Sequence, residues 1–284
     1  PWARWPATWR SFVCPSGSAR GGGRGRSSAG GEAASTMKLI AHRGASLEAP
    51  ENTLHAIQLA WQERADGVEV DVQTSKDGRC LLMHDETLER TAGLTGRVAD
   101  QTWDILRAAD AGSWKGPRWR HCSIPLLRDV LRVVPNGRHI YLELKGDREM
   151  LAPLAADFEV ACPPHDRVRF VGFSPRLLRE VKHLLPAFPV YWNVEPQHTR
   201  GAPHDWRAES LCAQAIRDGF QGLSVGWCEA VNAEFIQAVR EHQLGLVVWT
   251  VDDEHVAQRL RAAGLPELMT NRPGYLRHKL QGMP

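Results

Sequence analysis

One short segment of the chain, residues 67–72, carries two carboxylates, Glu69 and Asp71, that alternate with valines. Successive side chains of a strand point to opposite faces, so both carboxylates share one face. A strand covered on both faces is normally apolar, and burying an unpaired carboxylate is very costly. The pattern predicts either a divalent cation held by these oxygens or, alternatively, an edge strand whose acidic face is solvated.

Further ionisable side chains stand at the ends of other strand-like segments. They are His42, Arg43, His84, Glu143 and Lys145. Three carboxylates with waters suit Mg²⁺ or Ca²⁺, whereas a zinc site would call for several imidazoles or thiolates together. Two histidines suit a general acid and a general base, and Arg and Lys bind phosphate oxygens. Together these groups predict phosphodiester chemistry.

The elements that must position these groups alternate along the chain between strands and helices. The predicted strands are 38–42, 67–72, 138–145, 167–173, 189–194, 222–225, 244–251 and 267–270. The predicted helices are 52–64, 125–134, 148–161, 175–185, 208–218, 232–242, 254–263 and 273–279. This alternation predicts an α/β fold, a (β/α)₈ barrel with its active site at the carboxyl ends of the strands. The alternative is a doubly wound open sheet, which would not need eight units.

One long excursion interrupts the alternation after the second strand. Residues 79–84 are predicted to return as a hairpin arm after the Lys76-Asp77-Gly78 turn. Residues 85–122 are predicted to be mostly irregular, with one short helix near Asp104. Excursions of this length inside a compact domain are usually functional.

Composition separates residues 1–36 from the rest of the 284-residue chain. This segment is rich in Gly, Ser, Ala and Arg and is predicted to be disordered. A mitochondrial transit peptide is one interpretation, and a non-native leader before Met37 is the favoured one. The domain is therefore expected to span 37–284. The net charge is +2, and the domain itself is mildly acidic, which argues against nucleic-acid binding.

Several runs of the sequence share the order and spacing of one known family. They are 40–45 (IAHRGA), 50–53 (PENT), 66–72 (DGVEVDV), 84–88 (HDETL), 124–127 (IPLL), 142–145 (LELK), 249–251 (WTV) and 270–273 (TNRP). With these runs, residues 37–280 resemble the glycerophosphodiester phosphodiesterase family, and most closely its compact bacterial cytoplasmic members. The resemblance implies a (β/α)₈ barrel with a small insertion after the second strand, here 85–122.

The resemblance also implies hydrolysis of glycerophosphodiesters, such as glycerophosphocholine or glycerophosphoethanolamine, to glycerol 3-phosphate and an alcohol. In the family, a substrate hydroxyl is thought to attack phosphorus, and water then opens the cyclic phosphate. The matching positions imply an acid–base pair, His42 and His84. They imply metal ligands for Mg²⁺ or Ca²⁺, namely Glu69, Asp71 and Glu143. They imply substrate contacts from Arg43, Lys145, Glu51 and Trp249, with Glu51 orienting Arg43 or approaching the metal.

One position departs from the family pattern. Asn271 stands where many members carry Asp, so contacts at the rim are the part of the resemblance in doubt. Two other functions remain open. A lysophospholipase D-type activity would need an apolar channel, for which Trp103, Trp114 and Trp119 of the excursion are candidates. A non-catalytic phosphate-ligand binder would normally have lost a histidine or a carboxylate.

The remaining expectations concern partners and location. The resemblance implies a small-molecule substrate, and the sequence shows no stretch long and apolar enough for membrane insertion. The six cysteines show no zinc-type spacing and are expected to be small buried hydrophobic residues in a reducing compartment. We therefore expect a cytoplasmic protein, either a monomer or a homodimer.

Overall fold

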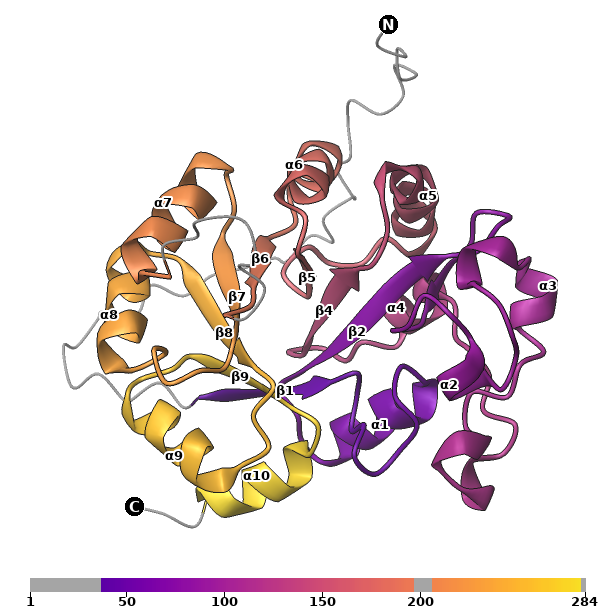
Figure 1. Ribbon diagram of the computed structural model, residues 1–284, viewed down its shortest axis with the longest axis horizontal. Helices are drawn as coiled ribbons and strands as arrows, with labels where there is room; N and C mark the ends of the chain where they lie inside the picture. The colour runs from indigo at the N-terminus through magenta and orange to yellow at the C-terminus, as the bar shows by residue number, and fades with distance from the viewer. Residues whose placement is uncertain (1–36, 197–205, 282–284) are drawn as a thin grey trace, which may run out of the picture. The chain divides into compact units, whose positions relative to one another are not determined.

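Eight parallel strands close into a barrel in the computed structural model, which describes residues 37–196 and 206–281 (Figure 1). The strands are β1 (Lys38–His42), β2 (Gly67–Thr74), β4 (His139–Leu144), β5 (Val168–Gly172), β6 (Val190–Val194), β7 (Gly222–Gly226), β8 (Gly245–Trp249) and β9 (Glu267–Thr270). Each pairs with the next, and β1 closes the ring by pairing with both β2 and β9. The predicted (β/α)₈ barrel is therefore confirmed. The leader predicted over 1–36 lies outside the described residues.

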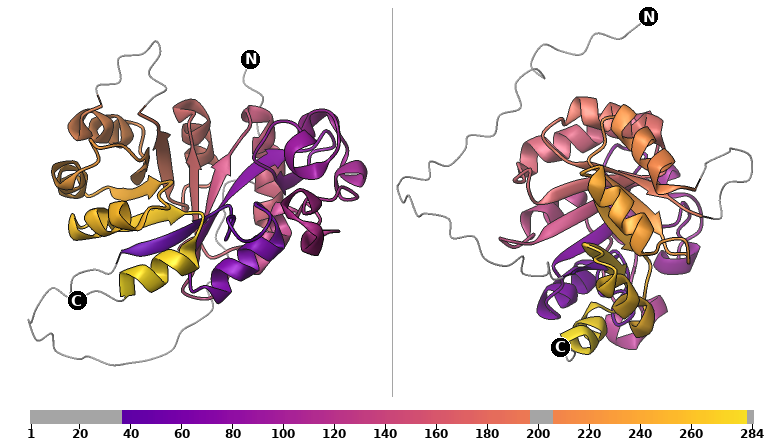
Figure 2. Two further views of the ribbon diagram at one scale, coloured as in Figure 1. Left: turned by 60° about the horizontal axis from the view of Figure 1, so that its bottom comes forward. Right: turned by 90° about the vertical axis from the view of Figure 1, so that its left-hand side faces the viewer.

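Helices surround the barrel and connect its strands, as the views in Figures 1 and 2 show. They are α1 (Leu54–Gln62), α4 (Leu127–Arg132), α5 (Leu151–Ala161), α6 (Pro175–Leu184), α7 (Ala208–Arg217), α8 (Ala233–Glu241), α9 (Glu254–Ala262) and α10 (Pro273–Gln281). Side chains cap several of them, because the first backbone N–H groups of a helix have no partner within it. The capping residues are Thr53, Ser174, Asn232 and Asp253. Within the described ranges, no helix combines the length and apolar character needed to span a membrane.

The predicted hairpin arm is β3 (Cys80–Leu82), which runs antiparallel to β2 outside the barrel. The insertion that follows holds α2 (Glu89–Ala92), α3 (Trp103–Leu106) and three 3₁₀ turns at Val98–Asp100, Ser113–Lys115 and Pro117–Trp119. The prediction of one helix near Asp104 matches α3 but missed α2 and the 3₁₀ turns. Elements this short do not complete enough turns to show helical periodicity.

The insertion is ordered by an apolar cluster of its own. The cluster comprises Leu81, Met83, Leu88, Ala92, Val98, Leu106, Ala109, Ala111, Ile124 and Leu126. It is separate from the larger core between the strands and the surrounding helices. The insertion lies to one side of the barrel, beyond β2 and beside α1 (Figure 1). Its side chains can therefore contact residues at the carboxyl ends of the strands on that side.

Large aromatic side chains fill the amino-terminal half of the barrel interior. The ring of Tyr191, on β6, lies over Gly222 on β7 and Gly245 on β8. A Cβ atom on Gly222 would come within 2.3 Å of this ring, and one on Gly245 within 2.2 Å of its hydroxyl. Tyr141 packs edge-on against Tyr191, with ring centroids 5.7 Å apart. The amino-terminal half of the barrel interior is therefore a packed core.

A small ionic cluster lies among these aromatic residues. The Tyr141 hydroxyl donates a hydrogen bond to Glu267, and His139 and Arg169 approach the same carboxylate at 3.8 and 3.9 Å. Burial, with Arg169 nearby, lowers the pKa of His139 to about 4, whereas Glu267 opposes this shift. His139 is therefore neutral in the folded protein at pH 7.

The cysteines only partly match the expectation that they are small buried hydrophobic residues. Cys80, Cys122 and Cys212 are free and buried, and Cys228 is free and half-buried. Cys162 departs from the expectation, because it is exposed.

The buried His139 predicts a pH dependence of stability. A histidine whose pKa is lower in the folded than in the unfolded chain favours unfolding as pH falls from about 6.5 towards 4. His139→Gln should therefore reduce the loss of unfolding free energy between pH 7 and pH 5 by on the order of 2 kcal/mol. Urea unfolding at both pH values measures this, with His165→Gln, at an exposed histidine, as the control. Equal losses in the His139 variant and the wild type would contradict the assignment.

Candidate active site

The two carboxylates of β2 lie inside the barrel at its carboxyl end. Glu69 and Asp71 are each only 1% exposed. Because β2 pairs with β1 on one side and β4 on the other, it is not an edge strand, and the alternative of a solvated acidic face is wrong. Glu143 on β4 is the register partner of Asp71. Each of the three carboxylates offers an oxygen within 4.8 Å of the other two, and we call these residues the carboxylate trio.

Burial affects the carboxylate trio unequally. Burial, with Asp71 and Glu143 nearby, raises the pKa of Glu69 well above its ordinary value. Burial and Asp71 likewise raise the pKa of Glu143. Burial would also raise the pKa of Asp71, but Lys145 and Arg43 hold it below its ordinary value. Glu69 Oε1 has no hydrogen-bond partner among residues 37–196 and 206–281. A set of oxygen donors with one unmatched buried oxygen suits a hard divalent cation.

Two cations flank the carboxylate trio. Lys145, directly after β4, places Nζ 2.5 Å from Glu143 Oε1 and 3.2 Å from Asp71 Oδ1. Arg43, directly after β1, places Nε 3.3 Å from Asp71 Oδ2. Burial alone would lower the pKa of both side chains, but the surrounding carboxylates raise it above the ordinary value. Both therefore remain positively charged and face the space where an anion would bind.

Asn52 is a site residue that the sequence reasoning missed. Its Nδ2 donates to Asp71 Oδ2 at 2.8 Å, and its Oδ1 accepts from the Asp71 backbone N–H at 3.0 Å. Its φ of 57° lies in the left-handed region, which Asn tolerates better than most residues. Asn52 belongs to the run 50–53 (PENT) that the chain shares with the family, but nothing in the sequence showed that its side-chain amide contacts Asp71.

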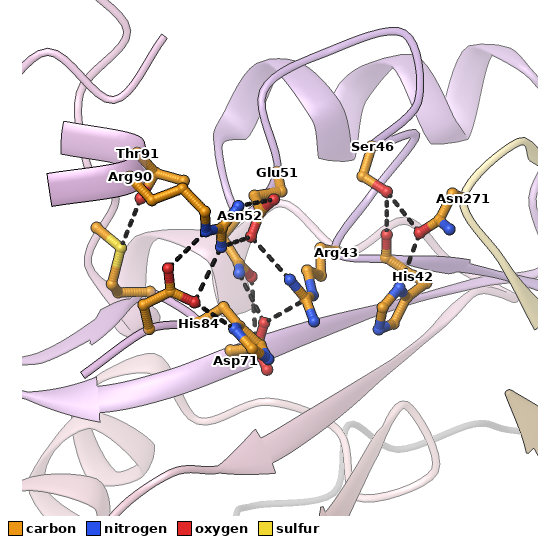
Figure 3. Close-up of polar contacts among 12 residues, drawn as sticks. His42, Arg43, Ser46, Glu51, Asn52, Asp71, His84, Arg90, Thr91 and Asn271 are labelled. Carbon is orange, nitrogen blue, oxygen red and sulfur yellow. Dashed lines mark hydrogen bonds and ion pairs between the residues drawn. The ribbon is translucent and has the colours of Figure 1, made fainter. Parts of the chain in front are cut away.

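His42 ends β1 and lies against the carboxylate trio. Its Nδ1 is 2.8 Å from Asn271 Oδ1 (Figure 3), and its Nε2 is 3.9 Å from Glu69 Oε2. Burial, with Arg43 nearby, lowers the pKa of His42 to about 4. The ring is therefore neutral at pH 7, which suits a proton acceptor.

His84 follows β3 and is more accessible, with 31% of its side chain exposed against 17% for His42. Its Nδ1 is 2.7 Å from Asp85 Oδ1. Hydrogen bonds from Arg90 and His84 hold the pKa of Asp85 at about 2, against the effect of burial. The turn that carries His84 is fixed by Gln73, another missed residue, whose Nε2 donates to three consecutive backbone carbonyls, those of residues 83–85.

Arg90 of α2 joins the two halves of the site. Its guanidinium contacts both carboxylate oxygens of Asp85, at 2.5 and 3.0 Å. It also contacts both oxygens of Glu51, at 2.9 and 2.8 Å. Glu51 Oε1 in turn accepts from Arg43 Nη1 at 2.8 Å. One continuous chain of contacts, drawn in Figure 3, therefore runs from His84 to Arg43 through the insertion. The sequence reasoning missed Arg90, since nothing in the insertion marked it out.

These groups surround a cavity of about 460 Å³ at the carboxyl ends of the strands. Seven of the nine predicted site residues line it, namely His42, Arg43, Glu69, His84, Glu143, Lys145 and Trp249. Asp71 and Glu51 lie behind that lining, where they contact Arg43. The far wall is formed by residues that include Val171, Phe173, Asn193, Ser224 and Met269, and it also carries one acid, Glu195, directly after β6. The cavity therefore has one side that carries most of its charged groups and a far wall that is mostly uncharged.

The chemistry that this arrangement supports is hydrolysis at phosphorus. Oxygen ligands for a divalent cation, two cations for phosphoryl oxygens and two imidazoles for proton transfer meet at the mouth of one barrel. The fold and the site together define a (β/α)₈-barrel phosphodiester hydrolase.

Comparison with known proteins gives the particular family. The sequence model of the glycerophosphoryl diester phosphodiesterase family matches residues 42–275, and the chain belongs to this family. A glycerophosphodiester phosphodiesterase of Bacillus subtilis is 30% identical over 85% of this chain and 85% of its own length. The protein YqiK of the same organism, described as uncharacterized, is 43% identical over 83% of this chain and 95% of its own.

A solved structure agrees with this assignment. It is an Oleispira antarctica phosphodiesterase in complex with the product sn-glycerol-3-phosphate, with a TM-score of 0.76 and 26% identity. The match covers 87% of this chain and 98% of the other. The predicted family and the predicted class of enzyme are therefore confirmed.

The position of Arg90 predicts that the insertion supports catalysis. Arg90→Met should raise the pKa of Asp85 from about 2 and should lower phosphodiesterase kcat by about 10- to 100-fold, a range typical of lost supporting contacts. The carboxyl ¹³C shift of Asp85 and steady-state kinetics measure the two effects. Arg107→Met removes an exposed arginine of the same insertion and should change neither. An Arg90 variant with wild-type kcat would show that catalysis does not need the contacts of Arg90 with Asp85 and Glu51.

Proposed function

We propose that the chain hydrolyses glycerophosphodiesters, such as glycerophosphocholine or glycerophosphoethanolamine, to glycerol 3-phosphate and an alcohol. The observation that carries this proposal is the meeting of the carboxylate trio, His42 and His84 in one cavity with Arg43 and Lys145. The related Oleispira structure, which holds sn-glycerol-3-phosphate, supports this choice of product. A phosphate at the charged side would face both cations at once.

The mostly uncharged far wall of the cavity suits the alcohol part of the substrate. Phe173 and Trp249 stand there at nearly right angles, with ring centroids 5.9 Å apart. Asn193 and Ser224, register partners on β6 and β7, line the same wall. A diester bound with its phosphate at Arg43 would extend its alcohol group toward these residues.

The carboxylate trio would hold the divalent cation, Mg²⁺ or Ca²⁺. When bound, such an ion supplies positive charge beside the phosphoryl oxygens as negative charge develops there. Oxygen ligands alone are compatible with either ion. The buried Glu69 Oε1, which lacks a hydrogen-bond partner within the described ranges, supports a cation at this position.

The two histidines would divide the proton transfers. His42, which is buried and neutral, would accept the proton of the substrate glycerol hydroxyl as that oxygen attacks phosphorus. His84, which is partly exposed and held by Asp85, would donate a proton to the departing alcohol. Arg43 and Lys145 would orient the phosphate, and Trp249 would cover the bound substrate. Water would then open the cyclic phosphate to give glycerol 3-phosphate.

Neither alternative function gains support from the structure. The tryptophans proposed to line an acyl channel are not among the residues lining the cavity. Trp114 instead donates to the backbone of Ala111 within the insertion, and Trp119 lies edge-on to His55 of α1. A non-catalytic phosphate binder would have no need for two histidines beside the carboxylate trio.

The reaction itself is the first prediction of this proposal. Chelated protein should release no glycerol 3-phosphate from glycerophosphocholine or glycerophosphoethanolamine, and added Mg²⁺ or Ca²⁺ should restore release. An enzyme-coupled glycerol 3-phosphate assay measures this. His42→Ala should lower kcat by about 10²- to 10⁴-fold while metal binding persists. Turnover of lysophosphatidylcholine but of neither glycerophosphodiester would instead favour the lysophospholipase D alternative.

The carboxylate trio predicts opposite effects of one substitution with and without metal. Glu69→Gln removes a buried carboxylate that repels its neighbours, so the chelated protein should melt at a higher temperature than wild type. The same variant should lose most of the Tm rise that Mg²⁺ or Ca²⁺ gives the wild type. Thermal melts with and without metal measure both effects. Glu149→Gln, at an exposed acid outside the cavity, is the control. An undiminished metal-induced rise in Glu69→Gln would exclude this residue as a ligand.

A further inference from the structure

The imidazole of His42 is held by a segment far away in the sequence. Asn271 directly follows β9, which pairs with β1 in the barrel, and its Oδ1 lies 2.8 Å from His42 Nδ1 (Figure 3). The Ser46 hydroxyl lies 3.0 Å from the same Oδ1 and 2.7 Å from the backbone oxygen of His42. The His42 ring is therefore oriented through a neutral amide.

A carboxylate fixes the orientation of that amide. Asp252 Oδ2 accepts from Asn271 Nδ2 at 2.6 Å. Asp252 Oδ1 accepts from the Asn271 backbone N–H and from the Thr270 hydroxyl, both at 2.8 Å. An ionised carboxylate can only accept hydrogen bonds. The NH₂ group of Asn271 must therefore face Asp252, and its carbonyl oxygen must face His42.

The amide orientation determines which ring nitrogen of His42 carries hydrogen. Asn271 Oδ1 can only accept, so His42 Nδ1 must donate to it. In the neutral ring, the hydrogen then sits on Nδ1, and Nε2 holds the free lone pair. Nε2 is also the nitrogen that lies 3.9 Å from Glu69 Oε2, on the side of the carboxylate trio.

We propose that Asp252 and Asn271 are positioning residues that fix His42 in the Nδ1–H tautomer, so that Nε2 is the atom that accepts a proton during catalysis. The catalytic half of this inference rests on the proposed function, and the tautomer does not. Sequence reasoning assigned Asn271 only to the rim, and Asp252 no role at all.

The geometry makes a specific prediction for Asp252→Asn. The backbone N–H of Asn271 would keep the oxygen of the new amide facing it, so the new NH₂ would meet the NH₂ of Asn271. Flipping the Asn271 amide relieves this clash, and Asn271 would then donate to His42 Nδ1. The His42 hydrogen should therefore move to Nε2, which removes the lone pair that accepts the proton.

The first experiment reads the tautomer directly. Imidazole ¹⁵N shifts of histidine-labelled protein distinguish Nδ1–H from Nε2–H, and the His42 signals, among those of 12 histidines, are assigned by their loss in His42→Gln. Wild type should show Nδ1–H and Asp252→Asn should show Nε2–H. Asp253→Asn is the matched control, because Asp253 caps α9 and Asn caps equally well. An Nε2–H ring in wild type, or an unchanged tautomer in Asp252→Asn, would overturn the proposal.

The second experiment tests the role in catalysis by rescue. Asp252→Asn should lower kcat at least about 100-fold, as expected when a catalytic histidine is held in the wrong tautomer, with little change in KM. Adding Asn271→Asp to it should restore kcat to within about tenfold of wild type. In this double variant, the amide at 252 donates to the carboxylate at 271, which accepts from His42 Nδ1–H. Asn271→Asp alone would place two carboxylates face to face and should remain impaired.

Failure of this proposal and failure of the proposed function give different results. A double variant as slow as Asp252→Asn, in an otherwise active enzyme, would leave these residues a merely structural role. Wild-type protein that shows the Nδ1–H ring but turns over no glycerophosphodiester would refute the proposed function and leave the tautomer assignment standing.

Discussion

The burial of three carboxylates inside the barrel is the constraint on which the rest of the site depends. Glu69, Asp71 and Glu143 would repel one another strongly in a medium of low polarity. Arg43 and Lys145 compensate Asp71 most fully, and its pKa alone of the three lies below the ordinary value. The pKa of the other two is raised. The ionised forms of Glu69 and Glu143 are therefore destabilised without a cation, as expected of a site organised around one.

The two histidines are supported from opposite parts of the chain. His42 depends on the segment after β9, through Asn271, and β9 reaches β1 only because the barrel closes. His84 depends on the insertion, through Asp85 and Arg90. The His42 ring is held by a neutral amide, whereas the more accessible His84 ring is held by a carboxylate. Their environments therefore differ, in keeping with the different proton-transfer roles proposed for them.

Sequence reasoning predicted the barrel and half of the cavity lining, because both follow from local patterns. Strand periodicity reveals Glu69 and Asp71, and the barrel rule places every strand end at one mouth. Asn52, Gln73, Arg90 and Asp252 were missed for a common reason. Each acts through a contact with a residue far from it in the chain, and a single sequence does not show which distant polar groups meet. The edge-strand alternative for 67–72 stayed open for the same reason, since pairing is a property of the sheet.

The barrel interior is divided into a packed amino-terminal half and a cavity at the carboxyl ends of the strands. This division explains how the fold tolerates three buried carboxylates. Below the cavity, Tyr141 and Tyr191 fill the barrel, and the two glycines opposite Tyr191 leave room for its ring. The buried carboxylate at that end, Glu267, accepts from the Tyr141 hydroxyl and has His139 and Arg169 beside it. At the mouth, by contrast, Glu69 Oε1 has no hydrogen-bond partner in the described part of the chain. A well-packed amino-terminal half stabilises the strands. The strands can then hold the carboxylate trio in place at their carboxyl ends, where a ligand can compensate its charge.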